Sequence, residues 1–158
     1  LCWVMKKYTR YKKQPYKQGT YKPVNPTKYK GYGNPTYRSS WELKFFQWCD
    51  KNENVLKWGS ESVVVPYISP VDKKVHRYFI DNIVTIKEGN NIKTYLVEIK
   101  PQKQTEPPIV NNRKKKSTLI YEAYHYTVNQ AKWEAARNYA KKKNLDFIIL
   151  TEKELFNK

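Results

Sequence analysis

The stretch that decides the fold is Tyr95-Leu96-Val97-Glu98-Ile99-Lys100-Pro101. Apolar residues fill most of it and a proline ends it, which is typical of a buried strand. Side chains alternate between the two faces of a strand, so Glu98 and Lys100 are expected on the same face. A Glu-x-Lys pair on a strand most often marks a solvated face. A catalytic role for this pair is indicated only when further site residues lie nearby.

An earlier strand is predicted at residues 75–86, and a turn signal at residues 88–91 joins it to this stretch. Asp81 lies in an apolar part of the earlier strand, where a lone carboxylate needs a partner or a metal. Counted outward from the turn, Asp81 lies about as far back as Glu98 lies forward. The two carboxylates are therefore expected to face each other across the hairpin.

Further elements lie on both sides of this hairpin. In chain order, the predicted elements are a helix capped by Ser39 or Ser40, strands at 62–67, 75–86 and 94–100, a polar loop at 102–117, a helix or broken helix pair at 119–143, and a strand at 147–150. The order is helix, three-strand meander, helix and strand. This pattern predicts an α/β (α+β) fold, with helices packed on a sheet.

Charge is distributed unevenly along the 158 residues, which carry 31 Lys and Arg against 14 acids, a formal net charge of +17. The first 38 residues hold ten of these bases, seven Tyr and four Pro, and no acid. We therefore predict an extended basic arm over residues 1–37 and a folded domain over residues 38–158. The arm is expected to bind DNA phosphates, with its Tyr stacking on unpaired bases, or to thread into a large assembly, and a solubilising tail is the simpler alternative.

The charge also bears on partners. A strongly basic surface attracts polyanions, so nucleic acid is the leading candidate. A membrane is the weaker one, because we find no amphipathic helix with a sustained basic face and no apolar run of spanning length. Cys2 and Cys49 are too few for a disulfide framework, and with His76 and His125 they offer no usual zinc spacing.

Two carboxylates and a lysine at one point of a sheet suggest metal-dependent phosphodiester hydrolysis. Asp81 and Glu98 would hold Mg²⁺, a hard cation that prefers oxygen ligands, with Mn²⁺ as a substitute. Lys100 would orient or deprotonate the attacking water and offset phosphate charge. Glu42, in the first helix, is a further candidate ligand and catalytic residue, although a glutamate in a first helical turn is also favoured by the helix dipole alone.

Other residues are candidates for substrate contacts and supporting roles. The expected DNA-binding residues are Arg38, Arg113, Lys114, Lys115, Lys116 and Lys132. Glu61 and Gln130 are candidates for a supporting layer behind the catalytic residues. Ordinary solvent-facing roles are the alternative for Gln130 and Lys132, and a structural salt bridge is the alternative for Glu61.

Five segments together resemble a known family. They are Tyr37-Arg38-Ser39-Ser40-Trp41-Glu42, Trp58-Gly59-Ser60-Glu61, Tyr78-Phe79-Ile80-Asp81, Glu98-Ile99-Lys100-Pro101 and Val128-Asn129-Gln130-Ala131-Lys132-Trp133. In order and spacing they resemble the head-completion nuclease family of contractile-tailed phages, within the PD-(D/E)xK restriction-endonuclease-like superfamily. The likeness spans roughly residues 30–155, and Ile80 stands where the superfamily motif has proline.

This resemblance implies a restriction-endonuclease-like core of helix, three-strand meander, helix and strand. It also implies a Mg²⁺-dependent endonuclease that cuts double-stranded DNA during phage head completion, after packaging. Head, portal or neck proteins would be its partners, in the host cytoplasm during assembly, with retention in the virion head or neck as an option. Two alternatives stay open: a non-catalytic structural head or neck protein, and a transposon-end-cleaving or junction-resolving enzyme of the same superfamily.

Overall fold

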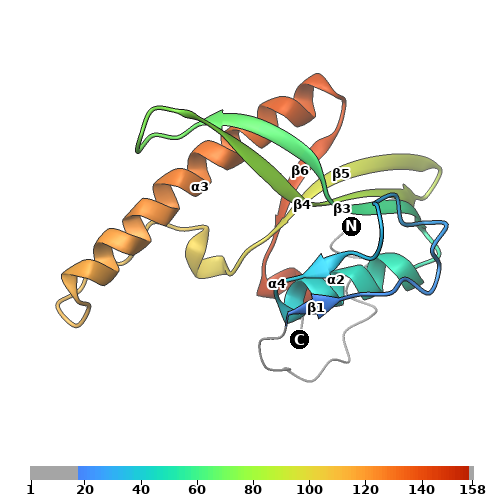
Figure 1. The fold of residues 1–158 in the computed structure, drawn as a ribbon, viewed down its shortest axis with the longest axis horizontal. Helices are drawn as coiled ribbons and strands as arrows, with labels where there is room; N and C mark the ends of the chain where they lie inside the picture. Colours follow the sequence, from blue (N-terminus) through green and yellow to red (C-terminus); the bar gives the residue numbers. More distant parts are fainter. Residues whose placement is uncertain (1–17, 157–158) are drawn as a thin grey trace.

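A computed structural model describes residues 18–156 as a mixed sheet flanked by helices (Figure 1). Its four-stranded sheet has the order β3-β4-β5-β6. The strands are β3 (Val55–Ile68), β4 (Val75–Glu88), β5 (Asn91–Ile99) and β6 (Asp146–Leu150). The first three form an antiparallel meander, and β6 pairs parallel to β5. The predicted meander and last strand are confirmed, with β3 beginning seven residues earlier than predicted.

The turn between β4 and β5 fixes how these two strands align. Gly89 has a φ of 62°, a left-handed conformation that glycine adopts without strain. From there the register runs from Glu88 opposite Asn91 back to Asn82 opposite Val97. One more step along this register brings Asp81 opposite Glu98, as the sequence predicts.

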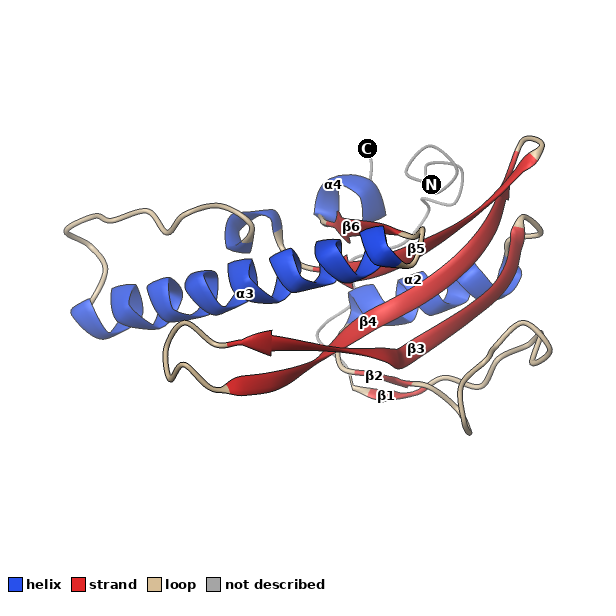
Figure 2. Ribbon diagram, turned by 90° about the horizontal axis from the view of Figure 1, so that it is seen from above, coloured by secondary structure: helices blue, strands red, loops and turns tan. Residues whose placement is uncertain are grey.

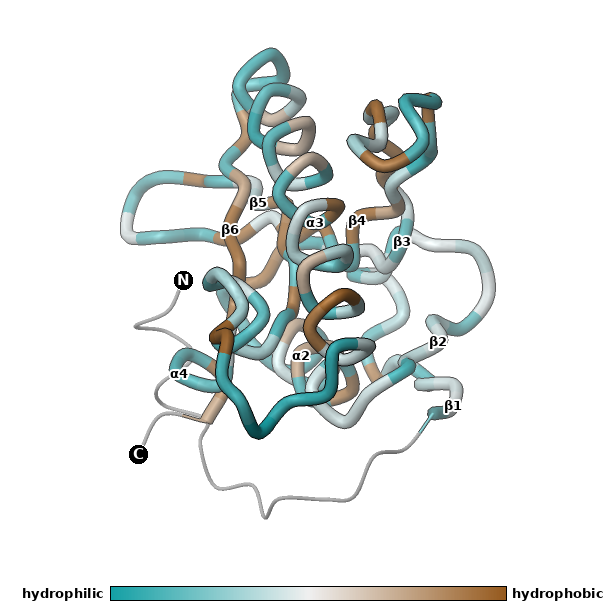
Figure 3. Tube along the Cα trace, turned by 90° about the vertical axis from the view of Figure 1, so that its left-hand side faces the viewer, coloured by the Kyte–Doolittle hydropathy of each residue, from teal (hydrophilic) through white to brown (hydrophobic). Residues whose placement is uncertain are grey.

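One face of the sheet packs against α2 (Ser40–Lys51). The Ser39 side chain caps this helix by accepting a 3.2 Å hydrogen bond from the Glu42 amide, which confirms the predicted helix start. Phe45 and Phe46 on α2 join Val97 of β5 in one buried cluster. Figure 3 shows hydrophobic residues along the inner strands β4 and β5 and along the edge strand β6. The short helix α4 (Glu152–Leu155) completes this side of the core.

The other face packs against α3 (Lys116–Lys142), the long helix that connects β5 to β6 (Figure 2). Trp133 and Ala136 of α3 lie in a second buried cluster with Leu96. Leu96 stands between Tyr95 and Val97, which face α2, so the strand alternates between the two helical layers. The sequence left open whether residues 119–143 form one helix or a broken helix pair. The structure shows one continuous helix.

Residues 18–37 depart from the expected extended arm. The short strands β1 (Gly19–Thr20) and β2 (Thr36–Tyr37) pair with each other. Asp50, fully buried on α2, accepts hydrogen bonds of 2.7, 2.7 and 2.9 Å from the Tyr21 hydroxyl and the amides of Val24 and Asn25. This segment is thus fastened to the domain, while residues 1–17 of the predicted arm lie outside the described residues.

The connection between β5 and α3 is mostly irregular. The predicted polar loop after β5 contains a single 3₁₀ turn, η2 (Gln102–Gln104), before α3 begins. Within residues 18–156, no helix combines the length and the apolar character that crossing a bilayer requires.

Candidate active site

The candidate site lies where the sheet forks. β4 pairs with β3 along nearly its whole length, but it pairs with β5 only from Asn82 onward. On the other side of Asn82, β4 leaves β5 and continues with β3 alone. Asp81 is the first residue of β4 beyond the paired region, and its Oδ2 accepts a 2.8 Å hydrogen bond from the Ile99 amide. The carboxylate of Asp81 therefore bridges the fork at the point where the strands separate.

Glu98 brings a second carboxylate to the same place. It follows Val97 on β5 and lies on the α3 side of the sheet, with only 4% of its surface exposed. Its Oε2 accepts a 2.5 Å hydrogen bond from the Tyr78 hydroxyl, and its Oε1 lies 3.3 Å from the Lys100 ammonium. The structure thus brings together Asp81, Glu98 and Lys100, the three residues that the sequence placed at one point.

Electrostatics at the fork disfavour two negative charges side by side. Burial raises the pKa of the Asp81 carboxyl well above its usual range, and the charge of Glu98 raises it further. The hydrogen bond from the Ile99 amide and the charge of Lys100 act in the opposite direction without cancelling the effect. A site with this imbalance is stabilised by whatever positive charge enters it, a proton or a cation.

The donor atoms suit a hard divalent cation. Asp81 and Glu98 offer carboxylate oxygens, and the Ile99 carbonyl lies between Glu98 and Lys100 in the sequence. Residues 18–156 contain no group of three or more His, Cys, Asp or Glu placed to hold a metal. A site with two carboxylates fits Mg²⁺, which commonly uses one or two carboxylates and keeps several waters.

Glu42 lies near this site without joining the two carboxylates in one cluster. Its carboxylate accepts hydrogen bonds of 3.0 Å from the Arg38 amide and 3.2 Å from the Ser39 hydroxyl, so it closes the first turn of α2. Its charge still contributes to the raised pKa of Asp81, which indicates proximity. The predicted ligand role of Glu42 stays a prediction.

Lys132 approaches the carboxylates from α3. Its ammonium nitrogen lies 5.8 and 5.6 Å from the ring centroids of Tyr67 and Tyr78. Burial lowers the pKa of this amine, while the charges of Glu98 and Asp81 oppose the shift. No hydrogen bond or ion pair to this ammonium comes from the described part of the chain. The site therefore has a second lysine whose donors remain available to a phosphate.

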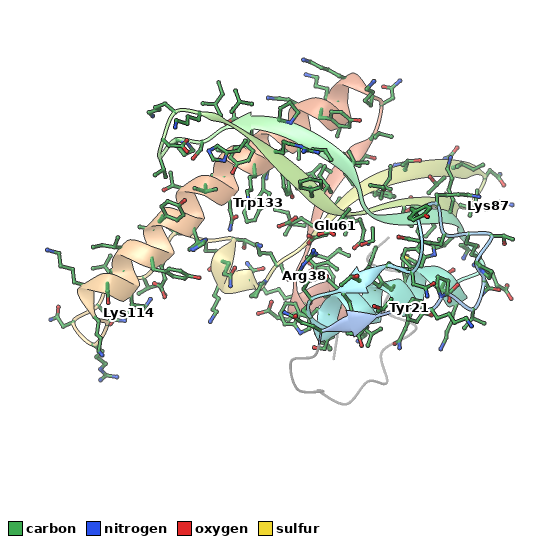
Figure 4. The ribbon with its side chains drawn as sticks, viewed as in Figure 1. Tyr21, Arg38, Glu61, Lys87, Lys114 and Trp133 are labelled. Atoms are coloured by element: carbon green, nitrogen blue, oxygen red, sulfur yellow. The ribbon has the colours of Figure 1, made fainter. Side chains whose placement is uncertain are left out.

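Arg38 and Glu61 form one rim of the site (Figure 4). Their side chains make an ion pair, and the pKa of Arg38 is raised first by that hydrogen bond and charge, with further contributions from Glu42 and Asp81. Glu61 lies at a β-bulge between Ser60 and Val63 and has a φ of 49°, unusual for a residue with a side chain. The salt-bridge alternative for Glu61 is thus observed as a contact.

The remaining predicted DNA-binding residues lie away from the carboxylates. Arg113, Lys115 and Lys116 are exposed where the loop enters α3, and Lys114 pairs with Glu122 at 2.7 Å. Figure 4 shows Lys114 at the N-terminal tip of α3, far from Glu61 and Arg38. Gln130 is half-buried, two residues before Lys132. Their contacts with DNA stay predictions.

Tyr78 and Tyr67 are two residues of the candidate site that the sequence did not indicate. Tyr78 donates to Glu98, and both rings lie under the Lys132 ammonium. A signal was present for Tyr78, because it lies three residues before Asp81, the candidate catalytic carboxylate, in the same strand. A tyrosine in an apolar strand, however, is most simply explained as part of the core.

Comparisons with known proteins show what this chain is similar to. The family model described as TnsA-like endonuclease N terminal matches residues 52–152, which include Asp81, Glu98, Lys100 and Lys132. The chain is also 40% identical over 138 residues to the head completion nuclease of Enterobacteria phage T4, covering 85% of this chain and 90% of that protein. Both findings support a nuclease role and a restriction-endonuclease-like fold.

Proposed function

Because the chain belongs to the TnsA-like endonuclease family, we propose that it is a Mg²⁺-dependent DNA endonuclease, with Mn²⁺ as a substitute. The observation that carries this proposal is the meeting of Asp81, Glu98 and Lys100 at the fork of the sheet. Two partly repelling carboxylates beside an ammonium are costly for stability and useful for phosphoryl chemistry.

Asp81 and Glu98 would hold the metal ion. When bound, Mg²⁺ would lower the pKa of a coordinated water and offset the charge that develops on the phosphate. The Ile99 amide fixes the Asp81 carboxylate, and the Tyr78 hydroxyl fixes that of Glu98, so both ligands are held before the ion arrives. Hydrolysis adds water to phosphorus and breaks one ester bond, leaving a hydroxyl end and a phosphate monoester.

The two lysines would serve the phosphate and the water. Lys100, anchored 3.3 Å from Glu98, is placed to orient the attacking water and to hydrogen-bond a phosphate oxygen. Lys132 adds a second positive charge from α3, and its half-buried position strengthens its pull on an anion. Arg38, on the opposite rim, would hold the DNA backbone beside the cut.

The biological setting follows from the relative whose name includes head completion. We place the activity late in phage head assembly, on packaged double-stranded DNA, with head, portal or neck proteins as neighbours. The host cytoplasm is then the compartment, and retention in the virion head or neck is compatible with it. A net charge of +17 supports binding to a polyanion without strong dependence on sequence.

The test is cleavage of supercoiled and linear duplex DNA with and without Mg²⁺ by wild type, Lys100→Ala and Lys93→Ala. Lys93 is an exposed lysine on the same strand, so its variant loses the same charge away from the fork. We expect metal-dependent nicking by wild type and Lys93→Ala, and a loss of at least about 100-fold in Lys100→Ala.

Two outcomes would contradict the proposal. Equal nicking by wild type and Lys100→Ala would move the active centre elsewhere. If wild type cuts nothing with Mg²⁺ or Mn²⁺, the structural head or neck protein becomes the better explanation. A branched substrate included in the same assay separates the junction-resolving alternative, which requires branched DNA to be cut while linear duplex is left intact.

A further inference from the structure

A cavity of about 480 Å³ is open to the surface, and no role proposed so far uses it. It lies between the loop that follows β5 and the N-terminal half of α3. The loop contributes residues from Lys103 to Ile109, and the helix side contributes residues from Lys114 to Asn129. Its volume is within the range of cavities that bind small molecules or single groups of larger ones.

Flat rings dominate one part of the lining. Tyr121 and His125 are one helical turn apart, and their ring centroids are 4.2 Å from each other. Tyr126 lines the cavity as well, and Pro107 and Pro108 lie on the loop side. Tyr121 keeps 65% of its surface exposed, so its ring is not covered by the chain itself. This surface is suited to stacking with a flat ligand.

The surroundings of the cavity are basic. Residues 103–116 contain five bases, Lys103, Arg113, Lys114, Lys115 and Lys116, and one acid, Glu106. Only Lys114 of these bases has an ion pair within the described residues, with Glu122. The cavity therefore combines ring faces with unpaired positive charge at its rim. Proteins that bind single-stranded nucleic acid use this combination, because bases stack on rings while cations follow the phosphates.

Two of the lining residues are close in the chain to the lysines of the proposed site. Lys103 comes three residues after Lys100, and Asn129 comes one helical turn before Lys132. A nucleotide in the cavity would thus belong to a strand that passes the two lysines of the proposed site. Paired bases within a duplex hide their faces in the stack, so ring faces in a cavity select bases that are unpaired.

We propose that this cavity binds unpaired bases of a single-stranded segment that adjoins the duplex at the cut site. The inference rests on the proposed nuclease function and narrows its substrate to DNA with a frayed, tailed or flapped strand. Lys103 and Arg113 contact the phosphates of that segment, and Tyr121 stacks with a base. A protein partner on the same surface is the competing occupant, which the test below separates.

The test measures binding without cleavage, in a chelator that removes divalent metal. Wild type and variants are titrated with a blunt duplex and with the same duplex carrying a single-stranded tail of either polarity, with 2-aminopurine in the tail. Three variants are compared: Tyr121→Ala, Tyr121→Phe, which keeps the ring, and Ile120→Ala, an exposed neighbour that does not line the cavity.

We expect wild type to prefer tailed DNA and to change the 2-aminopurine fluorescence. Tyr121→Ala should bind tailed DNA about 5- to 100-fold more weakly and blunt duplex normally, because stacking on one ring is lost. Tyr121→Phe and Ile120→Ala should behave like wild type. Because Tyr121 is exposed, its substitution should leave the fold intact, which thermal unfolding checks.

The proposal is overturned if wild type binds tailed and blunt DNA equally, or if Tyr121→Ala weakens both by the same factor. It is overturned as well if the fluorescence of the tail is unchanged on binding, which would favour a protein occupant. None of these results depends on metal or on cleavage. A failure here therefore leaves the nicking assay standing, and a failure of the nicking assay is seen separately.

Discussion

Replacing Asp81 with asparagine should make the protein more stable in metal-free buffer, although it should abolish metal-dependent cutting. The variant keeps the shape of the side chain, and its amide oxygen can still accept the hydrogen bond from Ile99. What it removes is a buried negative charge beside Glu98. A buried carboxylate that lowers the free energy of unfolding is more readily explained by a role in function than by a role in folding.

The magnitude follows from opposing terms. Two charges about 5 Å apart, in a medium with an effective dielectric constant of about 20, repel by about 3 kcal/mol. Loss of the attraction to Lys100 and a weaker hydrogen bond from Ile99 offset part of this gain. We therefore expect a net increase of about 1–2 kcal/mol in the free energy of unfolding, or about 2–8 °C in Tm for a domain of this size.

The gain should depend on pH in a definite direction. The pKa of Asp81 is raised in the folded protein, so folding makes its carboxyl harder to ionise. Below the unfolded pKa, near 4, the group is protonated in both states and carries no penalty. As pH rises above that value, the wild type loses stability until the folded pKa is passed. The difference between Asp81→Asn and wild type should therefore be absent near pH 3 and grow toward neutral pH.

Thermal unfolding in a chelator and in Mg²⁺ measures these effects. Asp146→Asn is the matched control, because Asp146 is an exposed aspartate of the same sheet and its loss changes the net charge equally. We expect Mg²⁺ to raise the Tm of wild type and Asp146→Asn and to leave Asp81→Asn unchanged. If Asp81→Asn is less stable than wild type in the chelator, Asp81 is a structural residue and the site is wrongly placed.

Two further predictions concern the partners of buried carboxylates. Tyr78→Phe leaves Glu98 without its hydroxyl donor, so it should lower cleavage about 10- to 100-fold at limiting Mg²⁺, measured by metal titration, with partial recovery at high Mg²⁺. Asp50→Asn should destabilise the fold by about 1–3 kcal/mol at pH 7, measured by denaturant unfolding. Burial raises the pKa of Asp50, but the hydrogen bonds from Tyr21, Val24 and Asn25 lower it overall, so this loss should begin to shrink as pH falls through the unfolded pKa, near 4, and should disappear only below the lowered folded pKa.

The parts of this fold that depend on neighbouring residues in the chain could be predicted from the sequence. Alternation along Tyr95–Lys100 and the turn at Gly89 are sufficient to align β4 with β5, because a shift of one residue would move every side chain of β5 to the opposite face of the sheet. The start of α2 was equally predictable, since Ser39 followed by Glu42 supplies the hydrogen bonds that a helix N-terminus lacks. Both features depend on residues close together in the chain.

The contacts that could not be predicted from the sequence join residues that are far apart in the chain. The contact between Asp50 and residues 21–25 joins positions more than twenty apart, and nothing in a Tyr-Lys-Pro-rich segment predicts it. The approach of Lys132 to Tyr78 requires knowing how α3 crosses the sheet. These contacts depend on how helices and strands pack against one another. The local periodicity of apolar residues does not predict that packing.

The fork itself links the rim of the site to its centre. β3 takes an extra residue at Glu61, and such a bulge bends and twists a strand, so it helps carry β4 away from β5 next to Asp81. Glu61 is held there by Arg38, whose backbone amide also donates to Glu42 at the start of α2. Arg38 therefore links the N-terminus of α2 to the bulge in β3, and the bulge lies next to the point where β4 separates from β5. Besides the phosphate contact proposed for it, Arg38 thus helps to fix the geometry that holds Asp81 beside Glu98.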